Sequence, residues 1–420
     1  MVGCVVQLFK FQITPIESCM NMRILMVHNK YKLKGGEDES TEAEIELLRR
    51  KGHIVDEFYE NNDKINKFSS ICVGISCIWS MKNYKRLTKK LIENNYDLVH
   101  VQNFFPLISP SVFYAASFSK VPVVHTLRNY RLLCPNGLLL KGDRSCEICT
   151  RKVFAWPGVL GGCYRGKTLA TLSVSLMLSI HKLLKTWEKK VDAFVALSEF
   201  EKEIFIKAGF PAKRIYVKPN FLIEDSGPGR GAGDFALYVG RLSVEKGVDI
   251  LIQSWSKVPG DSKLKIIGSG PLEQDLKKIA SNDSRISFLG RLPMAEALKV
   301  MGEAKVVVVP SRCHETFGRV VIESFSKGTP VLVSSSGAPS ELVNDGKNGF
   351  RFSINSEKEL SDKLTLFFSK NFCAEKFREN SRKAFLERFS EEKNYKNIYE
   401  IYAEVLRESN SFNKLSNADT

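Results

Sequence analysis

Two glutamates with seven residues between them lie in a segment that could bind a phosphorylated sugar, Glu315-Thr-Phe-Gly-Arg-Val-Val-Ile-Glu323. The segment begins as a loop after an apolar run and continues into a predicted helix that Gly328 ends. The start of a helix offers free backbone N–H groups, which suit a diphosphate, and Gly318 lets a ligand approach the backbone closely. Glu323 could accept hydrogen bonds from ribose hydroxyls, and Glu315 from those of a sugar. A surface helix with two unrelated carboxylates fits the spacing equally well.

A second charged segment, Gly240-Arg-Leu-Ser-Val-Glu-Lys-Gly247, also follows an apolar run. Arg241 and Lys246 in this glycine-bounded loop could neutralise a departing diphosphate without a metal ion. The chain has no Asp-x-Asp pair of the kind that chelates a nucleotide-bound divalent cation. The alternative is a solvated basic turn.

Two features of the first half point to the same chemistry with less force. Gly35-Gly36 separates the first apolar run from a predicted helix, as in a phosphate-binding turn, although a full dinucleotide fingerprint and a P-loop lysine are absent. His125 ends another apolar run, so in a parallel sheet it would face the ligand edge. A structural role for this histidine is the alternative.

Four of the ten cysteines crowd into a loop-rich segment, residues 134–163. One Cys-x2-Cys pair flanked by two single cysteines is typical of a four-thiolate zinc site that orders a poorly packed insertion. The alternatives are free thiols and an iron–sulfur cluster. The candidate ligands are Cys134, Cys146, Cys149 and Cys163.

The composition narrows the class of protein. The 420 residues are 43% hydrophobic, which excludes intrinsic disorder for most of the chain, and the length predicts two domains. The net charge of +15 favours anionic partners such as nucleotides, phosphorylated lipids, acidic membranes or nucleic acid. Residues 1–21 lack the basic start and cleavage site of a secretory signal, and we treat them as an extension before the first strand. No apolar run is long enough for a membrane-spanning helix.

Short apolar runs alternate with helical patterns in both halves, which predicts two doubly wound parallel sheets that face an interdomain cleft. The first domain is expected over residues 22–218 and the second over 219–394, with a polar linker near 224–233. A helix over 395–412 is long enough to cross back to the first domain. The predicted strands cover 23–27, 54–59, 98–102, 121–125 and 191–197, then 235–239, 264–267, 286–289, 306–309 and 330–333.

A further helical pattern, Leu169–Leu184, is apolar and then turns basic at Lys182 and Lys185. Such a helix suits attachment to an anionic membrane surface, where a lipid-borne acceptor would lie. A helix buried against a neighbouring element is the alternative.

Taken in order, these motifs resemble the retaining glycosyltransferases of family 4, whose GT-B fold has two Rossmann-like domains. The resemblance covers roughly residues 22–405, and Phe221 departs from it, because glycine commonly follows Pro219-Asn220 in the family. The motifs that carry it are Glu315–Glu323, Gly240–Gly247, Gly268-Ser-Gly-Pro271, Phe288-Leu-Gly-Arg291, Gly35-Gly36 and His125.

The resemblance implies roles for the residues of the second domain. Arg241 and Lys246 would bind the donor diphosphate and Glu323 the nucleotide ribose. Glu315, with the backbone of Phe317 and Gly318, would hold the donor sugar. Loops near Gly268 and Arg291 would contact the base.

For the first domain the resemblance implies that His125 lies beside the reacting sugar and that Gly35-Gly36 approaches the phosphates. The family's departing diphosphate takes the proton of the acceptor, so the anomeric configuration is retained. His125, Glu315, Arg241 and Lys246 would then be the catalytic group, with no cofactor required.

The expected function is transfer of a hexose from a nucleotide sugar, UDP- or GDP-linked, to a glycan or lipid-linked acceptor in surface polysaccharide synthesis. The expected location is cytoplasmic and peripheral on the inner face of the membrane. Rival hypotheses are a GT-B nucleotide-sugar epimerase, a phosphorylase, and a basic zinc-containing nucleic-acid-binding protein. Binding to nucleic acid is not expected, because no basic stretch is interleaved with aromatic residues.

Overall fold

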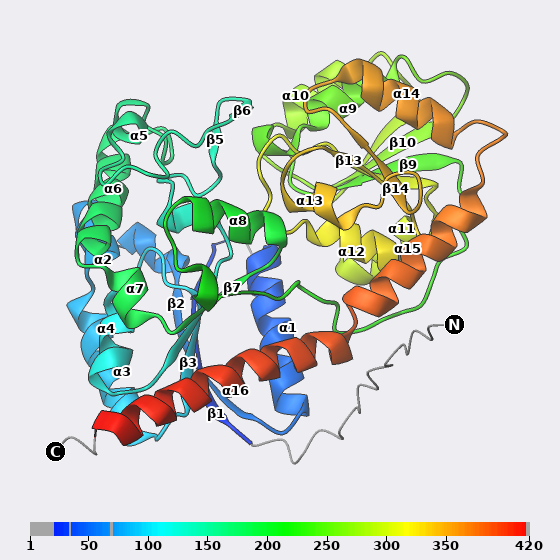
Figure 1. Ribbon diagram of the computed structural model, residues 1–420. Coiled ribbons are helices and arrows are strands. Elements are labelled where there is room, and N and C mark those ends of the chain that lie inside the picture. The colour runs from blue at the N-terminus through cyan, green and yellow to red at the C-terminus, as the bar shows by residue number, and fades with distance from the viewer. Residues whose placement is uncertain (1–20, 33–34, 68–69, 417–420) are drawn as a thin grey trace, which may run out of the picture.

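The computed structural model describes residues 21–32, 35–67 and 70–416, so the predicted extension over 1–21 lies almost wholly outside the described residues. Two α/β domains lie side by side, each built on a parallel sheet (Figure 1). The prediction of a GT-B-type α/β architecture is confirmed.

The first sheet has the order β2-β1-β3-β4-β7-β8, and all its pairings are parallel. Its strands are β1 (Arg23–Lys30), β2 (Ile54–Asn61), β3 (Leu98–Asn103), β4 (Val123–Thr126), β7 (Ala193–Ala196) and β8 (Ile215–Val217). Its helices are α1 (Gly36–Arg50), α2 (Ser70–Ile78), α3 (Met81–Glu93), α4 (Ser111–Phe118), α5 (Trp156–Leu160), α6 (Thr168–Leu183), α7 (Thr186–Lys190) and α8 (Glu199–Lys207).

The second sheet has the order β11-β10-β9-β12-β13-β14 and is also parallel. Its strands are β9 (Phe235–Val239), β10 (Lys263–Ile267), β11 (Ile286–Gly290), β12 (Val306–Val309), β13 (Val331–Ser334) and β14 (Gly349–Phe352). Its helices are α9 (Val248–Trp255), α10 (Glu273–Ala280), α11 (Met294–Glu303), α12 (Arg319–Ser326), α13 (Gly337–Leu342), α14 (Glu357–Phe367) and α15 (Ala374–Arg388).

Both faces of each sheet are buried, because successive strand residues point to opposite faces. Along β1, Ile24 and Met26 pack with α1, whereas Leu25 and Val27 belong to the core on the other face. The second sheet is covered in the same way, by α9, α10 and α14 on one face and by α11, α12 and α15 on the other. Four hydrophobic layers result, and they hold the loops at the strand ends in place.

The last helix, α16 (Glu391–Ser416), runs from the second domain across the first (Figure 1). Ile398 and Tyr402 join the core that α1 and β1 share. The hydroxyl of Tyr395 lies 3.0 Å from Nε2 of His53. The helix begins earlier than its apolar pattern, at Glu391, because Ser390 precedes it and accepts the N–H of Lys393.

Several short elements differ from the sequence-based expectation. The strand expected from Val121 begins at Val123, because Pro122 has no N–H to donate. The edge strands β8 and β14 and a small hairpin of β5 (Leu140–Lys141) and β6 (Arg144–Ser145) were not predicted. Each of these has at most four residues, too few to show a clear pattern.

Candidate functional site

The loops that follow β9, β10 and β11 in the second domain are joined to one another by backbone hydrogen bonds. The N–H of Gly240 donates to the carbonyl of Ile267 at 3.0 Å, and that of Gly268 donates to Gly290 at 2.8 Å. A Cβ on Gly268 would lie 1.8 Å from the Gly240 oxygen, and its φ is +142°, so this position requires glycine. Arg291 is exposed directly after the Gly290 turn.

Lys246 and Glu315 come together although they belong to different motifs. Nζ of Lys246 donates to Oε1 of Glu315 at 2.7 Å, and the hydroxyl of Ser311 donates to the same oxygen. Burial by itself would lower the pKa of Lys246, but the Glu315 carboxylate outweighs it and the pKa is raised. Lys246 is therefore a firmly protonated cation at the start of the Glu315–Glu323 segment.

Arg241 lies on the outer side of the same loop and is largely exposed. Its Nη2 donates to Oε1 of Glu245 at 2.5 Å, and Glu245 also accepts the hydroxyl of Ser243 at 2.6 Å. Water screens an ion pair in which the cation is this exposed, so the pair is weak. Arg241 can therefore exchange Glu245 for an incoming anion with little loss of stability.

Helix α12 starts at the candidate diphosphate position. Its N-cap, Gly318, has φ +87°, and a Cβ there would lie 2.7 Å from Pro339. The ring of Phe317 is buried in the core, so only its backbone is available to a ligand. Glu323 is buried on α12, and burial raises the pKa of its carboxyl, although Arg319 at 3.3 Å opposes the shift.

Arg319 also joins the two domains. Its Nη1 donates to Oε2 of Glu39 at 2.7 Å and to the carbonyl of Gly36 at 3.2 Å. A Cβ on Gly36 would lie 3.4 Å from the Arg319 side chain. The Gly35-Gly36 turn thus faces the glutamate segment of the other domain, with Gly35 as the N-cap of α1.

His125 lies at the end of β4, buried beside the rings of Phe104 and Phe113. Burial lowers its pKa to about 4, although the bond to Val101 opposes the shift, so the ring is neutral at pH 7. The Val101 carbonyl lies 2.8 Å from Nδ1. We therefore assign the proton to Nδ1, which leaves Nε2 as a hydrogen-bond acceptor.

His125 lines a small pocket at the carboxyl ends of β3 and β4. Asn103, Arg128 and Arg131 line the same pocket, so both hydrogen-bond donors and acceptors surround it. Such a pocket fits a small polar ligand group. His125 is thus both a packed core residue and a pocket residue.

Three further contacts join the two domains. The hydroxyl of Thr316 donates to the carbonyl of Arg128 at 3.1 Å, and the hydroxyl of Ser198 donates to the carbonyl of Thr316 at 3.0 Å. The carboxylate of Glu341 accepts the N–H groups of Glu199 and Phe200, at 3.2 and 2.8 Å. Residues of the second domain therefore cap and hold the start of α8.

Sequence reasoning missed a buried charged network beneath this edge of the first domain. Glu44 of α1 accepts from Nζ of Lys218 at 2.6 Å, and both side chains are 1% exposed. Burial would raise the pKa of Glu44, but the neighbouring charges, Lys218 foremost, lower it to about 2. His100 lies 3.3 Å from Glu44, and burial lowers its pKa to about 3.

Arg128 extends this network toward the pocket. Its Nε donates to Gln102 at 2.9 Å and its Nη1 to Asn220 at 2.7 Å. Asn394, just inside α16, accepts from Lys218 and donates to the carbonyl of Pro219. The network thus fixes the crossing between domains. The position of Lys218-Pro-Asn220 directly after β8 was the signal that could have drawn attention to it.

The four cysteines of the 134–163 insertion influence one another electrostatically. Burial raises the pKa values of Cys149 and Cys163, and the other thiols of the set raise them further. Thiolate chemistry suits zinc. Yet within 21–32, 35–67 and 70–416 no three His, Cys, Asp or Glu side chains are grouped as metal ligands. The arrangement of the four thiols therefore does not test the prediction of a zinc site.

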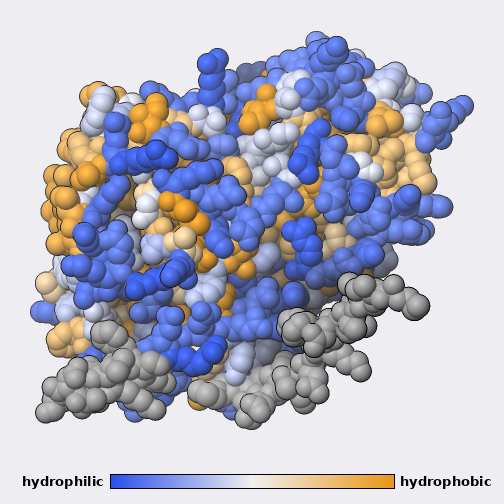
Figure 2. All heavy atoms as spheres, in the orientation of Figure 1, coloured by the Kyte–Doolittle hydropathy of each residue, from blue (hydrophilic) through white to orange (hydrophobic). Residues whose placement is uncertain are grey.

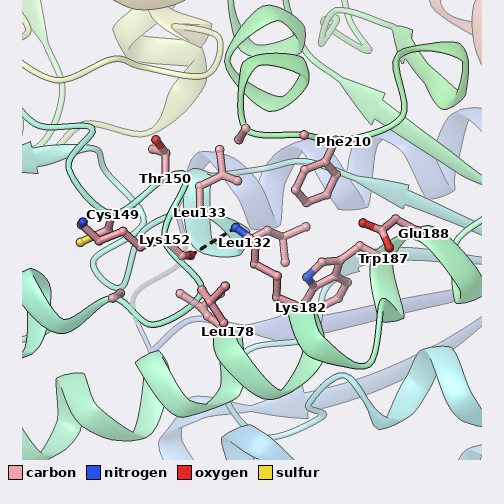
Figure 3. Close-up of a pocket in the computed structure, with 14 residues that line it drawn as sticks. Leu132, Leu133, Cys149, Thr150, Lys152, Leu178, Lys182, Trp187, Glu188 and Phe210 are labelled. Atoms are coloured by element: carbon pink, nitrogen blue, oxygen red, sulfur yellow. Dashed lines mark hydrogen bonds between the residues drawn. The ribbon is translucent and has the colours of Figure 1, made fainter.

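A larger pocket lies away from the strand ends, between α6, α7 and the cysteine-rich insertion (Figure 3). Leu133, Trp187 and Phe210 give it an apolar lining. Nζ of Lys182 crosses its edge and donates to the carbonyl of Lys152 at 3.2 Å. Cys149 and Lys182 line this pocket, but none of the residues expected to bind the donor does, so the candidate site is the interdomain edge and not this pocket.

Comparison with known families assigns both halves of the chain. Residues 41–225 match the family model described as glycosyltransferase family 4, and residues 228–384 match glycosyl transferases group 1. The boundary between the two matches falls in the polar segment after β8, where the structure passes from one domain to the other. The epimerase and nucleic-acid-binding hypotheses are not favoured by these matches.

Curated relatives cover most of the chain. An uncharacterized 42.6 kDa protein in the cps region of Klebsiella pneumoniae is 27% identical over 362 residues, which is 76% of this chain and 87% of that protein. An uncharacterized glycosyltransferase of Methanocaldococcus jannaschii is 26% identical over 352 residues, 78% of this chain and 84% of its own.

Solved structures share the fold at low sequence identity. HepE of Anabaena, solved in complex with UDP and glucose, gives a TM-score of 0.65 at 19% identity, over 91% of this chain and 100% of that one. The lipopolysaccharide outer core galactosyltransferase WaaB gives 0.62 at 17% identity, over 91% and 99%. No helix of the described part of the chain is long and apolar enough to cross a membrane.

Proposed function

We propose a function for this chain on the basis that it belongs to the family 4-type glycosyltransferases of the GT-B fold. It transfers a hexose from a nucleotide sugar with retention of the anomeric configuration. The acceptor would be a glycan or a lipid-linked sugar of a surface polysaccharide. Relatives with named acceptors support this class, among them the phosphatidyl-myo-inositol mannosyltransferase of Mycobacterium leprae, which is 27% identical over 48% of this chain.

The observation that carries the proposal is the contact between Lys246 and Glu315. It brings a protonated cation beside the loop that enters α12, where free N–H groups and the positive helix end also favour an anion. Solved HepE structures contain UDP or UDP-glucose, which supports a nucleotide-sugar donor in a fold of this kind.

In the proposed reaction the bond from the anomeric carbon to the diphosphate oxygen breaks, and a bond to the acceptor oxygen forms on the same face. The acceptor proton passes to the departing diphosphate. Lys246 and Arg241 stabilise the charge that develops on the diphosphate. Glu315 orients the donor sugar, and Glu323 accepts hydrogen bonds from the ribose hydroxyls. Nε2 of neutral His125 accepts a hydrogen bond from a sugar hydroxyl.

A thermal-shift screen against UDP-, GDP-, ADP- and dTDP-sugars tests the donor class. One donor series should raise the melting temperature of the full chain, because a ligand that binds only the folded state stabilises it. NMR of the anomeric proton of the product then reports the configuration. Inversion would contradict the proposed mechanism, and no shift with any nucleotide sugar would contradict the donor.

We also propose that the diphosphate site works without a divalent ion, because two cations and a helix start can supply the charge. Turnover should survive EDTA. A strict and rapidly reversible requirement for added Mg²⁺ or Mn²⁺ would contradict this. The partly buried Lys246–Glu315 pair near the loop entry supports the idea that charge is supplied by the chain.

Structural zinc in the 134–163 insertion remains our proposal on the chemistry of its four thiols. Elemental analysis of protein purified under reducing conditions should find about one zinc per chain. Cys146→Ser should lower both zinc content and melting temperature, because binding of the metal orders the loop. Cys373→Ser, an exposed cysteine of the second domain, is the matched control. Metal-free protein with an unchanged melting temperature would contradict the proposal.

A further inference from the structure

Three packed helices of the first domain expose a set of large apolar side chains, which we call the apolar face. Hydrophobic residues gather along the left edge of the molecule in Figure 2, where Figure 1 places α6 and α2. Leu169 is 79% exposed, Leu160 77% and Ile71 75%. The members of the apolar face are Ile71, Ile75, Trp156, Leu160, Leu169, Leu176, Ile180 and Leu183.

The exposure follows from how α6 is packed. Its buried residues, including Val174, Met177 and His181, form one side of the helix. Leu169, Leu176, Ile180 and Leu183 recur at helical spacing on the opposite side. A helix with apolar residues on both sides has more apolar surface than the domain can cover.

Helices α2 and α5 extend this surface on either side of α6. Gly74 of α2 lies against Ser173 of α6, and a Cβ there would be 2.7 Å from the serine oxygen. This close approach places Ile71 and Ile75 beside the exposed side of α6. Helix α5 packs on α6 as well and brings Trp156 and Leu160. The apolar face is therefore continuous over three elements.

The segments that form this surface carry only positive formal charges, although Glu60 and Glu93 pair with Arg86 and Lys89 of α3. Residues 70–92 and 148–187, which supply α2, α5, α6 and most of α3, contain no Asp or Glu. The same two segments contain Lys82, Lys85, Arg86, Lys89, Lys90, Arg151, Lys152, Arg165, Lys167, Lys182 and Lys185. A large apolar patch rimmed by one sign of charge marks an interaction surface.

The second domain shows what ordinary exposure looks like in this protein. Its exposed large apolar residues, such as Ile279, Leu289 and Leu386, lie on separate elements. Isolated residues of that kind need no partner. The apolar face differs because its members are neighbours and because acidic residues are missing from its own segments.

We propose that the apolar face docks on an anionic lipid bilayer, with its apolar side chains in the interfacial layer and the surrounding Lys and Arg on the headgroups. Apolar burial and attraction to anionic lipid together set the strength of such binding. The charge pattern selects this occupant, because a second copy of the chain would bring the same positive charges against it. The inference adds a location to the proposed function and is measured without a sugar.

Co-sedimentation of the full chain with vesicles tests the surface. Vesicles of phosphatidylcholine with phosphatidylglycerol should bind the protein, and phosphatidylcholine alone should bind it far less. Added salt should weaken binding, because it screens the headgroup charge. The double variant Ile71→Asp/Leu169→Asp should bind at least about tenfold more weakly, because two apolar side chains that would enter the bilayer are lost. Ile279→Asp/Leu386→Asp is the matched control in the second domain.

Each outcome decides the matter. Equal binding of both double variants, or no binding to anionic vesicles, would overturn the proposal, as would a concentration-dependent dimer that Ile71→Asp/Leu169→Asp abolishes. The milder variant Ile71→Ser/Leu169→Ser covers the case in which the aspartates disturb folding. The nucleotide-sugar thermal shift should be unchanged in all these variants. Loss of vesicle binding with the shift intact therefore separates this inference from the proposed function.

Discussion

The two domains differ in how exposed their charged side chains are near the interdomain edge. In the second domain the Arg241 side chain is 64% exposed and Lys246 is 29% exposed, each beside a carboxylate of a surface loop. In the first domain Glu44 and Lys218 are 1% exposed. Loop cations can exchange a carboxylate for a ligand at little cost, whereas a buried pair cannot be opened without unfolding its surroundings.

This contrast separates chemistry from support. The second domain holds the groups that would meet a diphosphate, and the first holds a network that sets the positions of α1, β3 and α16. Changes in the loops of the second domain should therefore alter turnover, and changes in the network should alter stability. The predictions below test that division, from the largest expected effect to the smallest.

The largest effect is expected from Glu44→Ala. It leaves the Lys218 ammonium buried without its 2.6 Å partner, and breaking a buried pair in this way costs about 3–5 kcal/mol of unfolding free energy. Urea unfolding measures the loss. Glu46→Ala is the matched control, since Glu46 lies on the same helix in an exposed pair with Arg50. Equal losses of unfolding free energy in the two variants would contradict the contrast between the buried and the exposed charged pairs.

A smaller free-energy effect, but a large one on rate, is expected from Lys246→Ala. Loss of one contact to the developing charge should lower kcat/KM at least about 10²-fold with the melting temperature nearly unchanged. Arg241→Ala should act in the same direction. Lys277→Ala, in an exposed pair with Glu273, should leave turnover unaltered. Near-normal turnover of both Lys246→Ala and Arg241→Ala would refute the donor assignment.

Acid should weaken the first domain through its buried histidines. The pKa of His125 falls from an ordinary 6.5 to about 4 on folding, so the unfolded chain takes up the proton first as pH drops. Its contribution to stability is complete above pH 6.5 and is lost between pH 6.5 and about 4, at about 1.4 kcal/mol per pH unit.

Unfolding curves between pH 7 and 5, a window set by this shift, measure that slope. His125→Phe should reduce it, since phenylalanine does not titrate. The exposed-loop residues of the second domain should contribute little in this range. A variant with the slope of the parent protein would show that acid acts elsewhere.

The smallest effect is expected from Glu341→Ala, which removes the cap that the second domain places on α8. Loss of a helix cap costs about 1 kcal/mol. Unfolding of the ligand-free chain measures it, with Glu387→Ala, an exposed glutamate of α15, as the control. Because Glu341 reaches across the cleft, a loss confined to the first domain's unfolding transition would sharpen the comparison, and no loss would remove Glu341 from the interface.

The ease of prediction also differs between the domains. Arg241, Lys246, Glu315 and Glu323 stand in short continuous segments, each after a clear strand, so their types and spacing could be read directly. The pairing of Lys246 with Glu315 could not, because it depends on how two loops of the same sheet edge meet.

Glu44 escaped notice because nothing in its segment distinguishes it. It lies among other glutamates of an amphipathic helix, and a glutamate is ordinarily exposed. Its burial depends on Lys218, 174 residues away in the chain, and on the helix that crosses from the second domain. Long-range contacts of this kind leave no local pattern.

The crossing helix has a consequence for how the protein is made. Tyr402 places its hydroxyl 2.6 Å from His100, and Asn394 contacts Lys218, so residues near the end of the chain complete the interior of the first domain. Domains emerge from the ribosome in chain order and tend to fold as they appear. Here the interior of the first domain is complete only once α16 has been made, and translation that stops before Glu391 leaves its charged interior open to water.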